Sequence, residues 1–275
     1  MSSAANVEPE PPVTRAHQFS TPADGNLISV AEGYRRWART YDSDPNPLLA
    51  REERYLSPLL TGLHGKQILD IACGTGRWLD RLTAEGCAGV GIDNSLAMLQ
   101  VAKQKSNIAT RLCAADCALL PFRTASFDLV ICSFALGHVI GLEILALELA
   151  RVSRPGMNLF VSDLHPEAYA HGWRVGFRDE SAALQIKTSP RSSGEIARTF
   201  RASGFDYLAC ESLHLGDAEK PVFERAGKSH MFEAACSLPA VLVCHFRRIG
   251  LSASYGWSRE AKSGRARSSI PQLFW

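Results

Sequence analysis

Residues 68–77 read ILDIACGTGR and carry the strongest structural signal in this chain. An apolar run that contains the acid Asp70 leads into a turn of small residues and then into a helix-like segment. A strand that ends in such a turn lets the backbone approach a ligand closely. A second acid, Asp93, ends the next apolar run at 89–92. A loop followed by a distal acid is how an open α/β sheet holds the two ribose hydroxyls of a nucleoside, so these residues predict a nucleoside site.

Apolar runs and helical stripes alternate on both sides of this loop. The run at 127–133 is almost entirely apolar, which is typical of a strand buried on both faces. Four successive strand–helix units predict an α/β fold, a parallel sheet with helices on both faces. The run at 239–246 is not followed by a helical crossover, so we expect it to pair antiparallel at the end of the sheet. The predicted strands are 67–71, 88–92, 109–115, 127–133, 158–163, 205–210 and 239–246.

The two ends of the chain differ in composition from its middle. Residues 1–26 are rich in proline, serine and alanine and lack periodicity, so we expect them to be disordered. Residues 27–250 form the predicted domain, and residues 251–275 form a basic tail that we expect to be flexible and solvated.

The composition and charge of the chain disfavour several classes of protein. A formal net charge of +2 is too small to indicate nucleic acid or an anionic membrane as a partner. The start of the chain has no apolar core of a secretory signal, and no run is long enough to span a bilayer. The eight cysteines form no CxxC pair, so we predict no metal site and expect reduced, buried thiols in a cytoplasmic protein. The cysteines expected in the core are Cys73, Cys113, Cys132, Cys210 and Cys244.

The glycine loop is not a dinucleotide or phosphate loop. A dinucleotide fingerprint needs a third small residue, but the sixth position is Leu79 counted from Gly74 and Arg77 counted from Ala72. No Gly-Lys-Ser/Thr follows the loop, which excludes a P-loop. The remaining possibility is a nucleoside site that needs no phosphate cradle, and an NAD-dependent oxidoreductase is the disfavoured alternative.

An ordered set of motifs resembles the class I S-adenosylmethionine-dependent methyltransferases. Residues 70–76 are similar to the first motif of that family, and 91–95 with Met98 downstream are similar to its acidic second strand and next helix. Residues 115–130 resemble its third and fourth motifs, and 154–156 resemble the turn before its fifth strand. The resemblance covers about residues 30–250. It implies a Rossmann-like sheet of seven mostly parallel strands with the last one antiparallel, and S-adenosylmethionine as the cofactor.

The resemblance also implies roles for individual residues. Glycines at 74 and 76 leave room for the methionine moiety and ribose, and Asp93 can accept both ribose hydroxyls. Asp116 can accept from the adenine amine, and Asp70 steadies the loop and helps to bind the methionine amino group. The predicted cofactor-binding residues are Tyr41, Asp70, Ala72, Gly74, Gly76, Asp93, Asn94, Met98, Asp116, Cys117 and Ser133.

A predicted helix at 28–41 resembles the lid of the methyltransferases of quinone and biotin synthesis. Tyr41 would then cover the methionine end of the cofactor. An aromatic stripe that packs on the edge of the sheet explains the same spacing.

An oxygen or acidic-carbon acceptor must lose a proton, which a histidine near the cofactor can take. His138 follows the fourth strand and is the first candidate base; a structural histidine is the competing interpretation. His165 follows the fifth strand and is the second candidate.

The acceptor is predicted to be a partly apolar small molecule. Residues 133–136 lack the proline-containing motif of methyltransferases that modify nucleic-acid bases, so a nucleic-acid acceptor is disfavoured. Two inserts, 165–188 and 215–230, are expected to form an acceptor lid whose apolar residues are Trp173, Phe177, Phe223 and Phe232. The sequence leaves open whether oxygen, carbon or nitrogen is methylated, and it does not give the oligomeric state. A non-catalytic nucleoside-binding protein of the same fold is the main alternative function.

Overall fold

The computed structural model describes residues 26–180 and 182–250. The predicted basic tail and nearly all of the predicted N-terminal disordered segment lie outside these residues. Seven strands form the main sheet in the order β4-β3-β2-β5-β6-β10-β9. Their bounds are Leu112–Ala114 (β4), Ala88–Asp93 (β3), Gln67–Ile71 (β2), Phe127–Ser133 (β5), Ser153–Leu164 (β6), Pro239–Arg248 (β10) and Phe205–His214 (β9).

The first five strands of that order are parallel, and β10 is antiparallel to both of its neighbours. The predicted seven-stranded, mostly parallel sheet is therefore confirmed. The expectation that 239–246 lies at the end of the sheet is wrong, because β9 forms that edge and β10 lies inside it. Residues 215–238, which include two short helices, return the chain from β9 and place β10 against β6, where most of its residues are buried.

Two apolar layers cover the sheet. Alternate residues of the buried strands point to opposite faces: Ile68 packs in one layer and Leu69 in the other. One layer contains residues of α5 (Leu142–Val152) and α7 (Ser193–Ala202). The other contains residues of α2 (Pro47–Leu56), α3 (Arg77–Ala84), α8 (Lys220–Arg225) and α9 (Phe232–Cys236). The remaining helices are α1 (Val30–Trp37), α4 (Leu96–Ala102), α6 (Pro166–Ala170) and the short 3₁₀ turns Ser57–Leu59, Leu136–His138, Asp217–Glu219 and Ser229–Met231.

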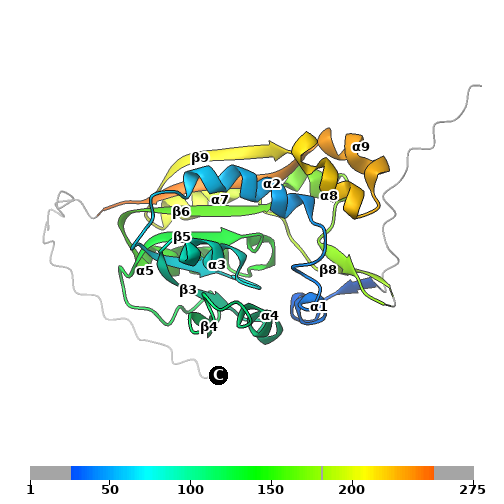
Figure 1. The fold of residues 1–275 in the computed structure, drawn as a ribbon. Helices are drawn as coiled ribbons and strands as arrows, with labels where there is room; N and C mark the ends of the chain where they lie inside the picture. The colour runs from blue at the N-terminus through cyan, green and yellow to red at the C-terminus, as the bar shows by residue number, and fades with distance from the viewer. Residues whose placement is uncertain (1–25, 181, 251–275) are drawn as a thin grey trace, which may run out of the picture.

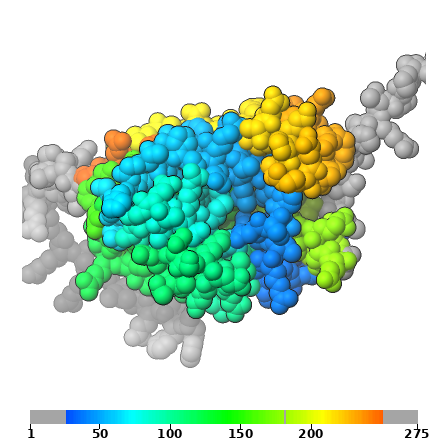
Figure 2. Space-filling model, in the orientation of Figure 1, coloured from blue at the N-terminus to red at the C-terminus, as the bar shows by residue number. Residues whose placement is uncertain are grey.

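A second, three-stranded sheet lies beyond the carboxyl end of β5 (Figure 1). It consists of β1 (Leu27–Ile28), β8 (Ala183–Ile186) and β7 (Gly176–Arg178). Trp37 at the end of α1 stacks on Phe177 of β7, with ring centroids 5.2 Å apart. Figure 2 shows α1 and the β7–β8 hairpin side by side on the surface. Sequence periodicity missed this sheet because strands of two to four residues carry too little pattern.

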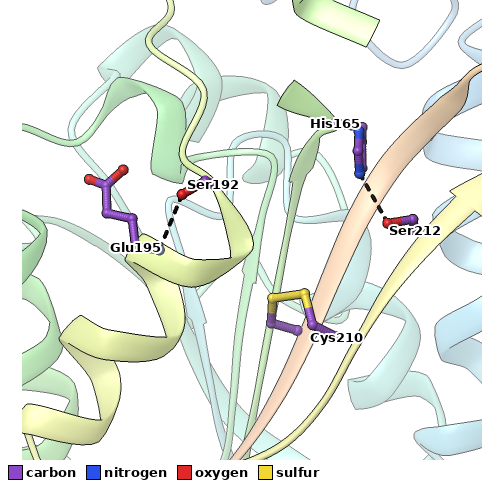
Figure 3. Close-up of a disulfide and its surroundings, with 6 residues drawn as sticks. His165, Ser192, Glu195, Cys210 and Ser212 are labelled. Carbon is purple, nitrogen blue, oxygen red and sulfur yellow. Dashed lines mark hydrogen bonds between the residues drawn. A yellow bond between two sulfur atoms is a disulfide. The ribbon is translucent and has the colours of Figure 1, made fainter. Parts of the chain in front are cut away.

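A disulfide joins Cys210 of β9 to Cys244 of β10 (Figure 3). The prediction that both cysteines are reduced core thiols is therefore wrong for this pair. The two residues are direct partners in the antiparallel register, so their side chains meet on one face of the sheet. Cys73, Cys113 and Cys132 are free. Within the described part of the chain, no helix is both long enough and apolar enough to cross a membrane.

Gly33 is where α1 meets the small sheet. A Cβ at this position would lie 2.6 Å from Cγ1 of Ile186, a buried residue of β8. We expect Gly33→Ala to lower the free energy of unfolding by about 1 kcal/mol, because overpacking costs more than the gain in helix propensity. Chemical denaturation measures the change.

Gly194 of α7 is the matched control, because a Cβ there meets only the end of the flexible Arg198 side chain. Gly194→Ala should be neutral or stabilising by about 0.5 kcal/mol. Equal losses in the two variants would show that the contact with Ile186 is unimportant.

Candidate active site

A cavity of about 300 Å³ opens at the carboxyl ends of β2, β3 and β5. The chain order reverses between β2 and β5, and such a switch point is where open α/β sheets bind ligands. Every residue of the predicted cofactor set lines this cavity except Gly76. Gly76 instead begins α3 with a φ of 78°, and a Cβ there would lie 2.4 Å from Cδ1 of Ile108.

Asp93 braces the glycine loop. One carboxylate oxygen accepts the Gly74 N–H at 2.8 Å, and the other accepts the Ser95 N–H at 2.7 Å. Each oxygen keeps a second lone pair. Burial raises the pKa of Asp93, and the three backbone N–H groups around it oppose that rise. The residue therefore has both a structural role and remaining capacity to accept hydrogen bonds.

Two further acids lie along the cavity. Asp70, on β2, is 3% exposed and accepts the Leu79 N–H at 3.1 Å. Burial raises the pKa of Asp70 to about 7. Asp116 follows β4 and is exposed, and its carboxylate accepts the Ala118 N–H at 2.8 Å. Asp70, Asp93 and Asp116 therefore bring three acidic side chains to one cavity.

Glu52 of α2 is a fully buried carboxylate that the sequence analysis did not single out. One of its oxygens accepts from the hydroxyls of Ser133, at 2.8 Å, and of Ser162. The other accepts from Arg77 and, at 3.2 Å, from the indole N–H of Trp78. This carboxylate ties α2 to the start of α3 and to the ends of β5 and β6. The sequence could not single out Glu52, because the adjacent Glu53 is the same residue type in the same helix.

The segment after α1 is fastened to the glycine loop. Asp42 accepts from the Thr75 hydroxyl at 2.5 Å and pairs with Lys105 at 2.9 Å. Lys105 also donates to the Thr75 carbonyl at 2.8 Å. The neighbouring Tyr41 lines the cavity and packs against Trp37, with ring centroids 4.8 Å apart. Tyr41 therefore belongs to the packed aromatic stripe and also lines the cavity, and its role as a cover for the cofactor stays a prediction.

The two candidate histidines have different surroundings. His138 lines the cavity, and its Nε2 lies 3.0 Å from the hydroxyl of Tyr34. Burial lowers the pKa of His138. His165 lies outside the cavity lining: its Nδ1 accepts the Glu167 N–H at 3.2 Å, and its Nε2 lies 3.0 Å from the Ser212 hydroxyl (Figure 3). The structure therefore does not bring His165 to the site.

The two inserts expected to form a lid do not line the cavity. Residues of 215–230 pack on the α2 side of the sheet, and those of 165–188 build the small sheet and α6. Their aromatic residues are held within apolar clusters. The walls at the open end come instead from α1 and the segment after β5, through Val30, Phe134, Val139 and Ile140.

Comparison with known proteins places the chain in a family. A family profile described as a methyltransferase domain matches residues 68–156. A demethylmenaquinone methyltransferase from Mycobacterium sp. (strain KMS) is 36% identical over 221 residues, which are 77% of this chain and 86% of that protein. The chain belongs to the class I S-adenosylmethionine-dependent methyltransferases.

The chain is also similar to two further proteins. A bifunctional protein of biotin biosynthesis from Cellvibrio japonicus is 31% identical over 137 residues; the match covers 50% of this chain and 27% of that protein. The crystal structure of an S-adenosylmethionine-dependent methyltransferase from Mesorhizobium loti has a TM-score of 0.57 at 23% identity and covers 74% of this chain and all of that one. The similarity to the Mesorhizobium loti structure supports the assignment of the fold.

The methyltransferase should show a pH-dependent stability that originates in Asp70. Because the folded-state pKa of about 7 exceeds the ordinary value of 3.8, the folded protein holds a proton that the unfolded chain releases. The contribution of Asp70 is therefore most favourable at pH 4 and is lost as the pH rises to about 7. We expect the stability difference between wild type and Asp70→Asn to change by about 2 kcal/mol or more between pH 4.5 and 7.5. Urea denaturation at the two pH values measures it, and a constant difference would contradict a raised pKa.

Proposed function

We propose that this methyltransferase holds S-adenosylmethionine in the cavity at the ends of β2, β3 and β5 and methylates a partly apolar, hydroxylated aromatic small molecule. The observation that carries the proposal is the coincidence, in one cavity, of the braced glycine loop, three acidic side chains and apolar residues beside a histidine. The family membership supplies the reaction type.

The residues of the cavity fit the cofactor. A Cβ at Gly74 would meet nothing within 4 Å, so the loop leaves open space beside Asp93. Asp93 would accept hydrogen bonds from the ribose hydroxyls, and Asp116 would accept one from the adenine amine. Asp70 would accept a hydrogen bond from the methionine ammonium group. Asn94, Met98 and Cys117 would line the adenine. When bound, the cofactor supplies an electrophilic methyl group on a sulfonium.

The acceptor is proposed from the open end of the cavity. Val30, Phe134 and Val139 supply apolar wall, and Ile140 at the mouth is 95% exposed. Such a surface suits an aromatic ring with an apolar substituent. The name of the 36% identical relative, a demethylmenaquinone methyltransferase, points to a quinone-type acceptor. Tyr34 and His138 beside this wall can then act on an acidic hydroxyl of the acceptor.

The test is methyl transfer from S-adenosylmethionine to 1,4-naphthohydroquinone, with the product identified by mass spectrometry. Wild type should form a methylated product, and Asp93→Ala should lose most of the turnover at limiting cofactor. Transfer only to protein or nucleic acid would contradict the small-molecule acceptor. Tight cofactor binding without turnover on a broad panel of acceptors would support the non-catalytic alternative instead.

A further inference from the structure

Both ring nitrogens of His138 are engaged. Nδ1 lies 3.1 Å from the carbonyl oxygen of Lys187, and Nε2 lies 3.0 Å from the hydroxyl of Tyr34. Because a carbonyl oxygen only accepts, Nδ1 carries the proton; the tautomer is assigned from this network. Nε2 is then the acceptor, and the Tyr34 hydroxyl donates to it. In this arrangement His138 cannot take a proton directly from a bound acceptor.

Tyr34 and His138 form a hydrogen-bonded pair in the wall of the cavity. Tyr34 lines the cavity, and its ring meets that of His138 edge-on, with centroids 5.4 Å apart. Burial raises the pKa of Tyr34 well above its usual range, and the neighbouring Tyr41, Asp163 and Asp93 raise it further. A tyrosine in these surroundings does not hold a negative charge. It can accept a proton on its oxygen only if its own proton leaves at the same time.

Three elements hold this pair in place. Tyr34 belongs to α1, which packs on β8 through Gly33 and Ile186. Lys187, whose carbonyl fixes the tautomer of His138, directly follows β8. The buried Asp163 carboxylate accepts the N–H of Gly137, the residue before His138, at 2.6 Å. The small sheet therefore sets the position of both members of the pair.

We propose that Tyr34 is the catalytic residue that takes the acceptor's proton, while passing its own proton to His138. This inference rests on the function proposed above. The acceptor O–H bond breaks and its proton binds the Tyr34 oxygen, while the Tyr34 O–H bond breaks and its proton binds Nε2. The acceptor becomes an anion and His138 becomes an imidazolium, so atoms and charge balance. Methylation of the anion gives a neutral product, and the partly exposed His138 returns the proton to water.

Turnover with 1,4-naphthohydroquinone separates this relay from a direct histidine base. We expect Tyr34→Phe and His138→Gln each to lower kcat about 100-fold or more, with cofactor affinity nearly unchanged. The double variant should lose no more than either single variant, because the two residues act as one unit. Losses that multiply in the double variant, or Tyr34→Phe with near wild-type kcat, would overturn the relay. Tyr207→Phe, at a tyrosine on β9 outside the cavity, is the control and should keep full activity.

A second measurement does not depend on turnover. 4-Nitrophenol, whose anion absorbs visible light, is titrated in the presence of S-adenosylhomocysteine and each variant. The relay predicts that the bound phenol ionises at a lower pH with wild type or Tyr207→Phe than with Tyr34→Phe or His138→Gln. Equal ionisation in all four proteins would overturn the proposal. Failure of wild type to methylate the naphthohydroquinone while this optical difference persists would contradict the proposed acceptor and leave the relay supported.

Discussion

Replacing Glu52 with glutamine should lower the free energy of unfolding by about 3 kcal/mol. The carboxylate is fully buried and is the close anionic partner of Arg77, whose side chain is 25% exposed. The substitution keeps the size of the side chain but removes the negative charge, so the Arg77 guanidinium loses its closest anionic partner. The glutamine NH₂ also cannot accept the two hydrogen bonds that one carboxylate oxygen now receives. Denaturant unfolding followed by tryptophan fluorescence measures the loss.

Glu53, the next residue of the same helix, is the matched control. Its side chain is 44% exposed and pairs with Arg81 at 2.8 Å and with Arg77 at 3.5 Å. Exposed pairs of this kind contribute little, so Glu53→Gln should cost less than about 1 kcal/mol. Similar losses in the two variants would mean that burial of Glu52 does not set its importance.

Replacing Asp93 with alanine should weaken binding of S-adenosylmethionine by about 1.5–3 kcal/mol, or roughly 10- to 150-fold. Two physical effects add. The variant loses a carboxylate that can accept the ribose hydroxyls, and it leaves the N–H groups of Gly74 and Ser95 without their acceptor. Without that brace, ordering the glycine loop on binding costs more free energy. Isothermal titration calorimetry measures the affinity, and wild type should show no comparable affinity for NAD.

The control for this variant is Asp206→Ala. Asp206 is an exposed acid on β9, away from the cavity, so its removal should leave cofactor affinity unchanged. Circular dichroism establishes that Asp93→Ala is folded. An affinity equal to wild type in folded Asp93→Ala would remove this residue from the site.

The parts of the fold that could be predicted were those with a strong local pattern. Strand β5 is a seven-residue run that is almost entirely apolar. Ser95 and Ser192 are residue types that favour helix starts, and each accepts the N–H group three residues ahead. The small sheet and the pairing of Cys210 with Cys244 could not be predicted. Both depend on which strands become neighbours and in which register they pair. A single sequence does not show that register directly.

The cofactor-binding residues could be proposed from the sequence because they also follow a strong local pattern. Its residues follow strand ends, and in a parallel sheet those ends meet at one edge, so Asp70, Asp93 and Asp116 had to converge. At the open end of the cavity, the sequence singled out His138 by its place after a strand but not the partners of that histidine. Three distant segments supply Tyr34, Lys187 and His138, so no sequence spacing predicts the hydrogen bonds between them.

The sequence alone determined the α/β class of the fold and the edge of the sheet where the cavity lies, because these follow from local periodicity and from small and acidic residues at strand ends. The methyl donor was indicated by the resemblance of the motifs to the methyltransferase family. Only the tertiary structure decided the occupancy of each histidine nitrogen and the burial of Glu52. Those properties arise from contacts between residues up to 110 positions apart, such as Glu52 with Ser162. The turn at residues 68–77 lines the cavity through its local backbone conformation, whereas the contacts of α1 and of the residue after β8 with the segment after β5 bring Tyr34 and His138 together.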